Sequence, residues 1–129
     1  MGSSYPTRED LVMSCDALAG DDVVNRQSED LGKIRHIMLE VPSGRIAYAV
    51  VAHGGVFGIG ERLIAVPWST LALDPARRCF VLDLPKSRLD EAPGFDKDHW
   101  PAMSDTSWAD KIHDYYGAAP YWKGKSPVR

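Results

Sequence analysis

The sequence is poor in the residues that enzyme and metal-site motifs require. It has two cysteines among 129 residues, Cys15 and Cys79, which are far apart and lack CxxC spacing. Because Cys79 begins an apolar, strand-like run, we predict a buried thiol there rather than half of a disulfide or a nucleophile. The four histidines are scattered, and no signature pairs one of them with a nucleophilic serine or cysteine. We therefore expect a protein that is not an enzyme and that has no cofactor.

Long apolar runs and an excess of positive charge are also missing. No apolar run approaches the ~20 residues needed to cross a bilayer, and the N-terminus has no hydrophobic segment like that of a signal peptide. The formal net charge of -3 gives no overall attraction toward nucleic acid. These absences predict a cytoplasmic protein with no membrane span and no nucleic-acid partner.

What the chain does contain is a series of short apolar runs separated by turn residues. The runs lie at residues 23–24, 31–41, 45–53, 62–68, 71–74 and 79–84. This spacing is typical of a small all-β sandwich or barrel. We predict an all-β fold, a small barrel of about six strands that is closed and filled by side chains.

Two of these runs carry local irregularities. In the second run Ile37, Leu39 and Val41 alternate on one face, but Ile34 is out of phase with them. One extra residue near position 35, a β-bulge, restores a single buried face. Pro67 has no N–H for a sheet ladder, so its strand must lie at an edge or end there. The adjacent Trp68 is large enough to fill one end of a barrel.

The stretch GGVFGIG at residues 54–60 raises the question of a phosphate-binding loop. A dinucleotide loop has the order G-x-G-x-x-G and opens into a helix, whereas Gly55, Gly58 and Gly60 give G-x-x-G-x-G. The residues that follow, ERLIAVPW, read as another strand. We interpret the glycines as a bend between two strands, where positive φ angles are needed.

The order of these pieces resembles the PRC-barrel family, small β-barrels found in the H subunit of the photosynthetic reaction centre and in a ribosome-maturation factor. The resemblance covers about residues 17–92. It rests on Gly20, Gly32-Lys33-Ile34, Ser43-Gly44-Arg45, Gly54-Gly55 and Ala65-Val66-Pro67-Trp68. It implies a PRC-type barrel that acts as a docking or adaptor module, similar to stand-alone bacterial members, and it brings no catalytic motif.

The resulting organisation has three parts. Residues 1–14 are polar and aperiodic and predict a flexible N-terminus. Residues 15–92 form the barrel domain, including one or two helical turns over KSRLDEA. Residues 93–129 form an aromatic-rich C-terminal extension with one helix near 105–116, capped by Ser104 or Asp105 and ended by Gly117.

The extension holds seven of the twelve aromatic residues, too much apolar surface to leave in water without consequence. It can fold back on its own barrel, pack on a second copy, or await another protein, because Trp and Tyr are typical interface anchors. We favour a scaffold module that self-associates as a homo-oligomer; its protein partners are unknown. The candidate interface residues are Trp68, Trp100, Trp108, Tyr115, Tyr116, Tyr121 and Trp122.

An alternative function is a small-ligand or metal sensor, or an enzyme, with a pocket between barrel and extension. Trp68, His53 and the loop Asp96–His99 are the expected lining of that pocket. The loop resembles the start of a calcium site, but the Gly and Glu that complete such a loop are missing. We interpret Asp96 and Asp98 as carboxylates that cap backbone amides, and we assign no metal site.

Overall fold

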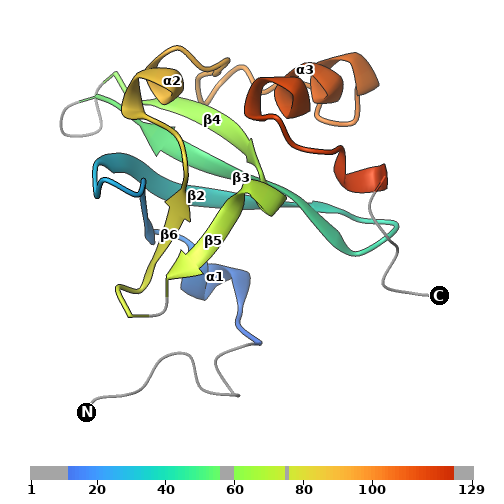
Figure 1. Cartoon of the computed structure of the whole chain (residues 1–129). Helices are drawn as coiled ribbons and strands as arrows, with labels where there is room; N and C mark the ends of the chain where they lie inside the picture. Colours follow the sequence, from blue (N-terminus) through green and yellow to red (C-terminus); the bar gives the residue numbers. More distant parts are fainter. Residues whose placement is uncertain (1–11, 56–59, 75, 124–129) are drawn as a thin grey trace.

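The computed structural model describes residues 12–55, 60–74 and 76–123. Its elements follow the predicted order, with helical segments before, within and after the six strands of one sheet (Figure 1). The strands are β1 (Asp22–Val24), β2 (Asp30–Glu40), β3 (Arg45–His53), β4 (Arg62–Pro67), β5 (Leu71–Asp74) and β6 (Cys79–Leu82). The helical segments are α1 (Cys15–Leu18), η2 (Trp68–Thr70), α2 (Lys86–Asp90), α3 (Thr106–Tyr116) and η3 (Tyr121–Lys123).

The sheet curls into a half-barrel with the strand order β4-β3-β2-β1-β6-β5. All neighbours are antiparallel except β1 and β6, which run parallel. The expected six-stranded barrel fold is confirmed, but its closure differs from the expectation: within the described residues β4 and β5 remain the two edges of the sheet. Pro67 ends β4 and the 3-10 turn η2 follows directly, so the chain turns away instead of pairing β4 with β5.

The predicted bulge in β2 is present. The pairing of β2 with β3 shifts between Ile34 and His36, and Ile34 is fully buried. A second shift between Met38 and Leu39 changes the phase again. Leu39 and Val41 were expected on the buried face, and this expectation is wrong: their side chains are 53% and 78% exposed. The end of the β2–β3 hairpin therefore presents apolar side chains to solvent.

The main core lies inside the curl of the sheet. Fully buried Leu31 and Ile34 from β2 meet Val51 from β3 and Ile64 from β4. Leu89 of α2 is also fully buried in this cluster, so α2 belongs to the barrel core. The bend after β3 agrees with the sequence interpretation, since Gly54, Gly55 and Gly60 have φ angles near +80° and β4, not a helix, follows. Residues 56–59 lie outside the described residues.

The C-terminal extension covers the β4 side of the sheet. Leu63 and Phe95 exchange backbone hydrogen bonds of 2.8 Å in both directions, which occupies part of the free edge of β4. Helix α3 then lies over β4, beside α2 (Figure 1). Asp105 accepts a hydrogen bond from the Ser107 amide, and Gly117 ends the helix with a left-handed φ of +64°. The predicted helical extension is confirmed.

The two cysteines differ sharply in accessibility. Cys15 is exposed, whereas Cys79 is 5% exposed, and burial raises the pKa of its thiol. Because the thiolate is the reactive species, we expect iodoacetamide at neutral pH to alkylate Cys15 and to leave Cys79 unmodified in the folded protein. Peptide mass spectrometry checks this, with urea-unfolded protein as the control in which both react. Fast alkylation of folded Cys79 would contradict the buried position.

A candidate docking groove

The aromatic extension is attached to the barrel through Tyr48 of β3. The side chain of Tyr48 is 1% exposed, and its ring packs edge-on against Trp108 of α3 and Tyr121 of η3, with centroid distances of 5.3 and 5.8 Å. Ala47, Ala65 and Ile112 complete this second, smaller core. The extension therefore packs on its own barrel as an additional layer.

Four buried side-chain atoms lack a hydrogen-bond partner within the described part of the chain, and two of them belong to neighbouring rings of this layer. These two are the hydroxyl of Tyr48 and Nε2 of His113, whose rings lie 5.5 Å apart, and the others are Arg45 Nε and the Tyr116 hydroxyl. His113 Nδ1 donates to the Ala109 carbonyl oxygen at 2.7 Å. Burial raises the pKa of Tyr48, so its phenol stays protonated at neutral pH. The Tyr48 hydroxyl is therefore available to donate or accept a hydrogen bond at neutral pH.

A groove of about 550 Å³ opens between the β2–β3 hairpin and the extension. One wall consists of Met38, Leu39 and Val41 from the hairpin, and the other includes Met103, Tyr121 and Trp122 from the extension. Ala47, Tyr48 and Ala109 also contribute to the lining, and Glu40, Ser104 and Thr106 supply its few polar groups. A site of this size with apolar walls suits an uncharged, hydrophobic occupant.

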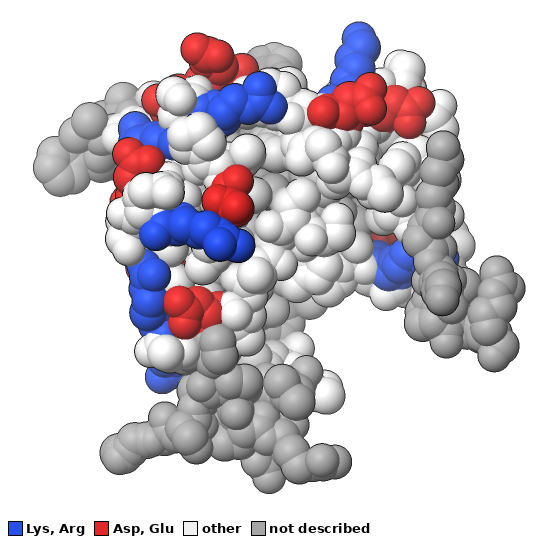
Figure 2. Space-filling model, viewed as in Figure 1, with Lys and Arg blue, Asp and Glu red and all other residues white. Residues whose placement is uncertain are grey.

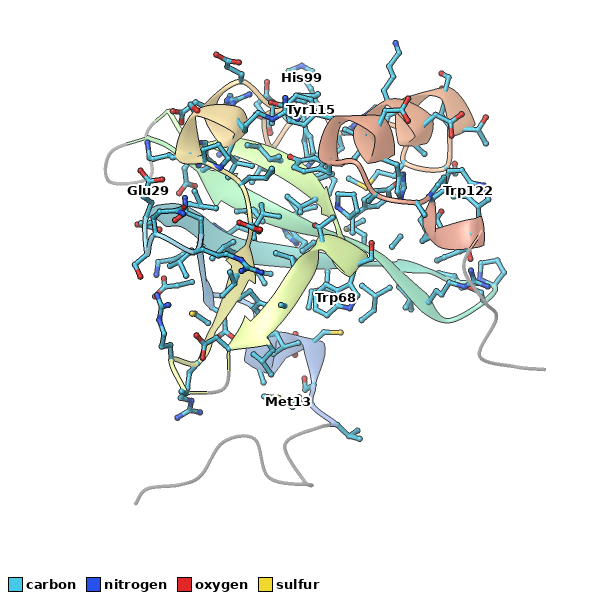
Figure 3. The ribbon with its side chains drawn as sticks, in the orientation of Figure 1. Met13, Glu29, Trp68, His99, Tyr115 and Trp122 are labelled. Atoms are coloured by element: carbon cyan, nitrogen blue, oxygen red, sulfur yellow. The ribbon has the colours of Figure 1, made fainter. Side chains whose placement is uncertain are left out.

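The predicted interface residues do not form one patch. Tyr121 and Trp122 line the groove, and Trp108 lies next to Tyr48. Trp68 is half-buried against the main core, where its ring contacts Phe80. Figure 3 shows Trp68, Tyr115 and Trp122 in three separate places.

The other members of the predicted set serve local packing. Trp100 is 39% exposed and its ring contacts His36 and Phe95. Tyr115 is tied to Arg88 of α2, whose guanidinium lies 4.2 Å from the ring centroid, and its hydroxyl donates to the Arg88 carbonyl oxygen. Tyr116 packs against both core clusters. Sequence reasoning missed Leu39, Val41 and Met103 as groove residues, although the apolar residues beside the turn Pro42-Ser43-Gly44 were a visible signal.

Trp68, His53 and the Asp96–His99 loop were expected to line one pocket, but in the described part of the chain Trp68 and the loop do not share the hollow that His53 borders. That hollow is polar, measures about 400 Å³ and lies at the opposite end of β3, with Lys33, Arg35, Glu61 and Lys86 around it. These cations are paired: Lys33 with Asp22, Arg35 with Glu61 and Lys86 with Asp90. Both ring nitrogens of His53 are engaged in hydrogen bonds, which leaves no free nitrogen to act as a base.

The Asp96–His99 loop has the capping structure that the sequence predicts. Asp96 Oδ1 accepts from the Asp98 amide and from His99 Nδ1, both at 2.8 Å, and these hydrogen bonds lower the pKa of Asp96, with the His99 contact the largest cause. Within residues 12–55, 60–74 and 76–123, no group of three His, Cys, Asp or Glu side chains is placed to hold a metal ion.

Charged side chains are distributed unevenly over the surface. Figure 2 shows Lys, Arg, Asp and Glu gathered along two margins of the molecule, while the middle of this face is largely uncharged.

In the described part of the chain, no helix is both long and apolar enough for a bilayer crossing.

A curled six-stranded half-barrel with a covering helical arm and an apolar groove is the architecture of a small β-barrel module. A family model described as the PRC-barrel domain matches residues 11–89, more than half of the chain. The chain belongs to the PRC-barrel family. A search of curated proteins finds no match.

Proposed function

We propose that this protein is a non-enzymatic interaction module that binds protein segments through the groove between the β2–β3 hairpin and the C-terminal extension, and that it acts in the cytoplasm. One observation carries the proposal: an apolar groove of about 550 Å³ adjoins two large hydrophobic side chains, Leu39 and Val41, that are mainly exposed. Adjacent exposed apolar side chains of this kind mark interaction sites in soluble proteins.

The chemistry of the groove supports binding over catalysis. Of its lining residues, those with ionisable side chains are Glu40 and two tyrosines. The pKa values of Tyr48 and Tyr121 are raised, mainly by burial, so both phenols are neutral at physiological pH. Glu40 accepts a hydrogen bond from Ser43 Oγ at 2.5 Å. A general base next to a nucleophile, as covalent or acid–base catalysis requires, is not found in this lining.

We expect short apolar peptides to bind in the groove and polar peptides of equal length not to bind. The natural reporters are methionine methyl groups, because two of the four methionines, Met38 and Met103, line the groove while Met13 lies elsewhere. A panel of acetylated, amidated hexapeptides rich in Leu, Val and Trp is titrated against ¹³C-methyl-methionine protein. The methyl resonances of Met38 and Met103 are expected to shift, and that of Met13 to remain.

The matched variant for this experiment is Ser104→Trp. Ser104 is an exposed groove residue, so an indole there fills the space without removing a core side chain. A filled groove has no room for at least one apolar side chain of the peptide. We therefore expect Ser104→Trp to bind the peptides at least about tenfold more weakly than the wild type does. No methyl shift with any peptide, or equal shifts in the wild type and Ser104→Trp, contradicts the proposed function.

A small apolar ligand is the second candidate, and the volume of the groove favours it. Sites for small molecules typically measure roughly 300–1,000 Å³ and are lined mainly by hydrophobic and aromatic side chains. If a small ligand is the natural occupant, native mass spectrometry is expected to detect a compound retained by the purified wild type and absent from the purified Ser104→Trp variant. Retention of no compound, together with peptide binding, supports the interaction module.

A further inference from the structure

We propose that the groove is occupied by the β2–β3 hairpin of a second copy of this chain, so that two copies form a two-fold dimer by exchanging Leu39 and Val41. This inference rests on the proposed function and identifies its partner. The proposal comes from the position of the exposed apolar side chains relative to the groove and from the charges around both.

The exposed side chains form a ridge, defined here as Leu39, Val41 and Pro42. Among the described residues four large hydrophobic residues are exposed, and two of them, Leu39 and Val41, belong to this ridge. Figure 1 shows the end of the β2–β3 hairpin extending beyond the body of the half-barrel. A protruding strand end with apolar side chains is suited to enter a concave site on another molecule.

The charges that line the groove suit an occupant with no net charge, such as the hairpin end of a second copy. Glu40 is the single acidic or basic side chain in the groove lining, and its cross-strand neighbour in the ladder is Arg45. The hairpin end therefore carries one negative and one positive side chain side by side. A strongly charged partner segment would meet no matching set of counter-charges in the groove, whereas the hairpin of a second copy would bring a balanced pair and the apolar ridge.

The same hairpin supplies both the ridge and one wall of the groove. A two-fold axis near the hairpin would therefore bury both ridges and fill both grooves in one closed contact, as isologous interfaces do. A head-to-tail contact would leave one ridge and one groove exposed at the ends and continue into a chain. A contact made by two hairpin ends alone is expected to fall in the weak class of interfaces, those below about 1,200 Å² in total.

The first test is the mass of the full chain in solution, by size-exclusion chromatography with light scattering over about two orders of magnitude in concentration, because a weak dimer dissociates on dilution. The wild type is expected to approach twice the mass of the chain at high concentration. The double variant Leu39→Asp/Val41→Asp is expected to remain a monomer throughout. Both positions are exposed, so far-UV circular dichroism is expected to be unchanged.

The matched control is Val12→Asp. The side chain of Val12 is 87% exposed but does not line the groove, so this variant adds an aspartate without touching the proposed interface and is expected to dimerise like the wild type. Ser104→Trp, which fills the groove and leaves the ridge intact, is expected to be monomeric. Because Leu39 and Val41 also line the groove, the ridge variant alters both halves of the contact, and its mixture with Ser104→Trp is expected to stay monomeric in native mass spectrometry.

A wild type that stays monomeric at the highest concentration overturns this inference. If apolar hexapeptides still shift Met38 and Met103 in that monomer, the proposed function stands and the partner is another protein. A dimer that persists in both the ridge variant and Ser104→Trp also overturns the inference, because the copies then meet through another surface.

Discussion

Replacing Gly32 with alanine is expected to destabilise the barrel more than the same replacement at any other described glycine. Gly32 lies in β2 with φ at +134°, a conformation that side chains rarely adopt. A Cβ built there would lie 2.1 Å from the Ala52 carbonyl oxygen and 3.0 Å from Val51 Cγ1. The closer atom is backbone of the neighbouring strand β3, so a rotamer change cannot relieve the overlap.

The position of Gly32 in the sheet makes this overlap costly. On its other side Gly32 pairs with Val23 of β1, so a shift of the β2 backbone away from β3 disturbs the ladder that joins β1 to the sheet. Strained φ and overpacking each cost about 1–3 kcal/mol. We expect Gly32→Ala to lower the free energy of unfolding by about 3–5 kcal/mol, a large share of the total for a small domain.

Urea denaturation followed by circular dichroism measures this loss. The matched control is Gly44→Ala in the β2–β3 turn, where φ is +75° but no atom lies within 4 Å of the built Cβ. It carries the conformational cost of a left-handed residue, about 1–2 kcal/mol, without the overlap. Equal losses for the two variants would show that the close approach of Gly32 to β3 does not determine stability.

Much of the fold could be predicted because its determinants are local in the sequence. The apolar runs identify all six strands, and the phase of Ile34 relative to Ile37 identifies the first bulge, which the shifted pairing confirms. The burial of Cys79 and the caps of α3 also follow from neighbouring residues. The second shift, between Met38 and Leu39, has no such local signal, and for that reason the exposure of Leu39 was not foreseen.

The candidate site could not be predicted because it joins distant parts of the chain. Its walls come from residues 38–48 and 103–122, and no periodicity in either segment states that they meet. The aromatic residues were correctly identified as important apolar surface, but a sequence cannot separate those that fill a core, such as Trp108, from those that line a groove, such as Trp122. Hydrophobicity predicts that a side chain will be buried, but the tertiary fold determines which residues it packs against.

Replacing His53 with leucine is expected to loosen the attachment of α2 to the barrel. The ring of His53 is 4% exposed, and its Nδ1 and Nε2 lie 2.7 Å from the Leu31 carbonyl oxygen and from Asp90 Oδ1. A carbonyl oxygen and a carboxylate oxygen both accept hydrogen bonds, so each nitrogen of the His53 ring faces an acceptor. His53 thereby connects β2, β3 and α2.

The surrounding charges reinforce this connection. Lys86 Nζ lies 3.6 Å from Asp90 Oδ1, and Arg62 of β4 donates to the Asp90 and Ala92 carbonyl oxygens at 2.8 and 2.9 Å. The hydrogen bond from His53 is the largest cause that lowers the pKa of Asp90, so this carboxyl is ionised at neutral pH. Helix α2 is consequently held by the His53–Asp90 hydrogen bond on one side and by the hydrogen bonds from Arg62 on the other.

In His53→Leu the buried Leu31 carbonyl oxygen loses its side-chain partner, a loss of about 1–3 kcal/mol in the free energy of unfolding. We also expect faster amide hydrogen exchange in residues 86–92 than in the wild type, which separates release of α2 from a uniform loss of stability. Asp90→Asn is the matched variant, because its amide oxygen still accepts from Nε2–H while the negative charge is removed. It is expected to retain more of the protection of α2 than His53→Leu does.

The pH dependence has a defined sign. Because the pKa of Asp90 is lower in the folded than in the unfolded protein, its contribution to stability is present above the unfolded value, about 3.9, and is lost as the pH falls through the folded value. The difference in unfolding free energy between the wild type and Asp90→Asn is therefore expected to shrink as urea denaturation is repeated from pH 7 toward pH 3. A difference that stays constant over this range, with exchange in α2 unaffected by His53→Leu, would show that α2 is held by the burial of Leu89 and by Arg62, without the histidine.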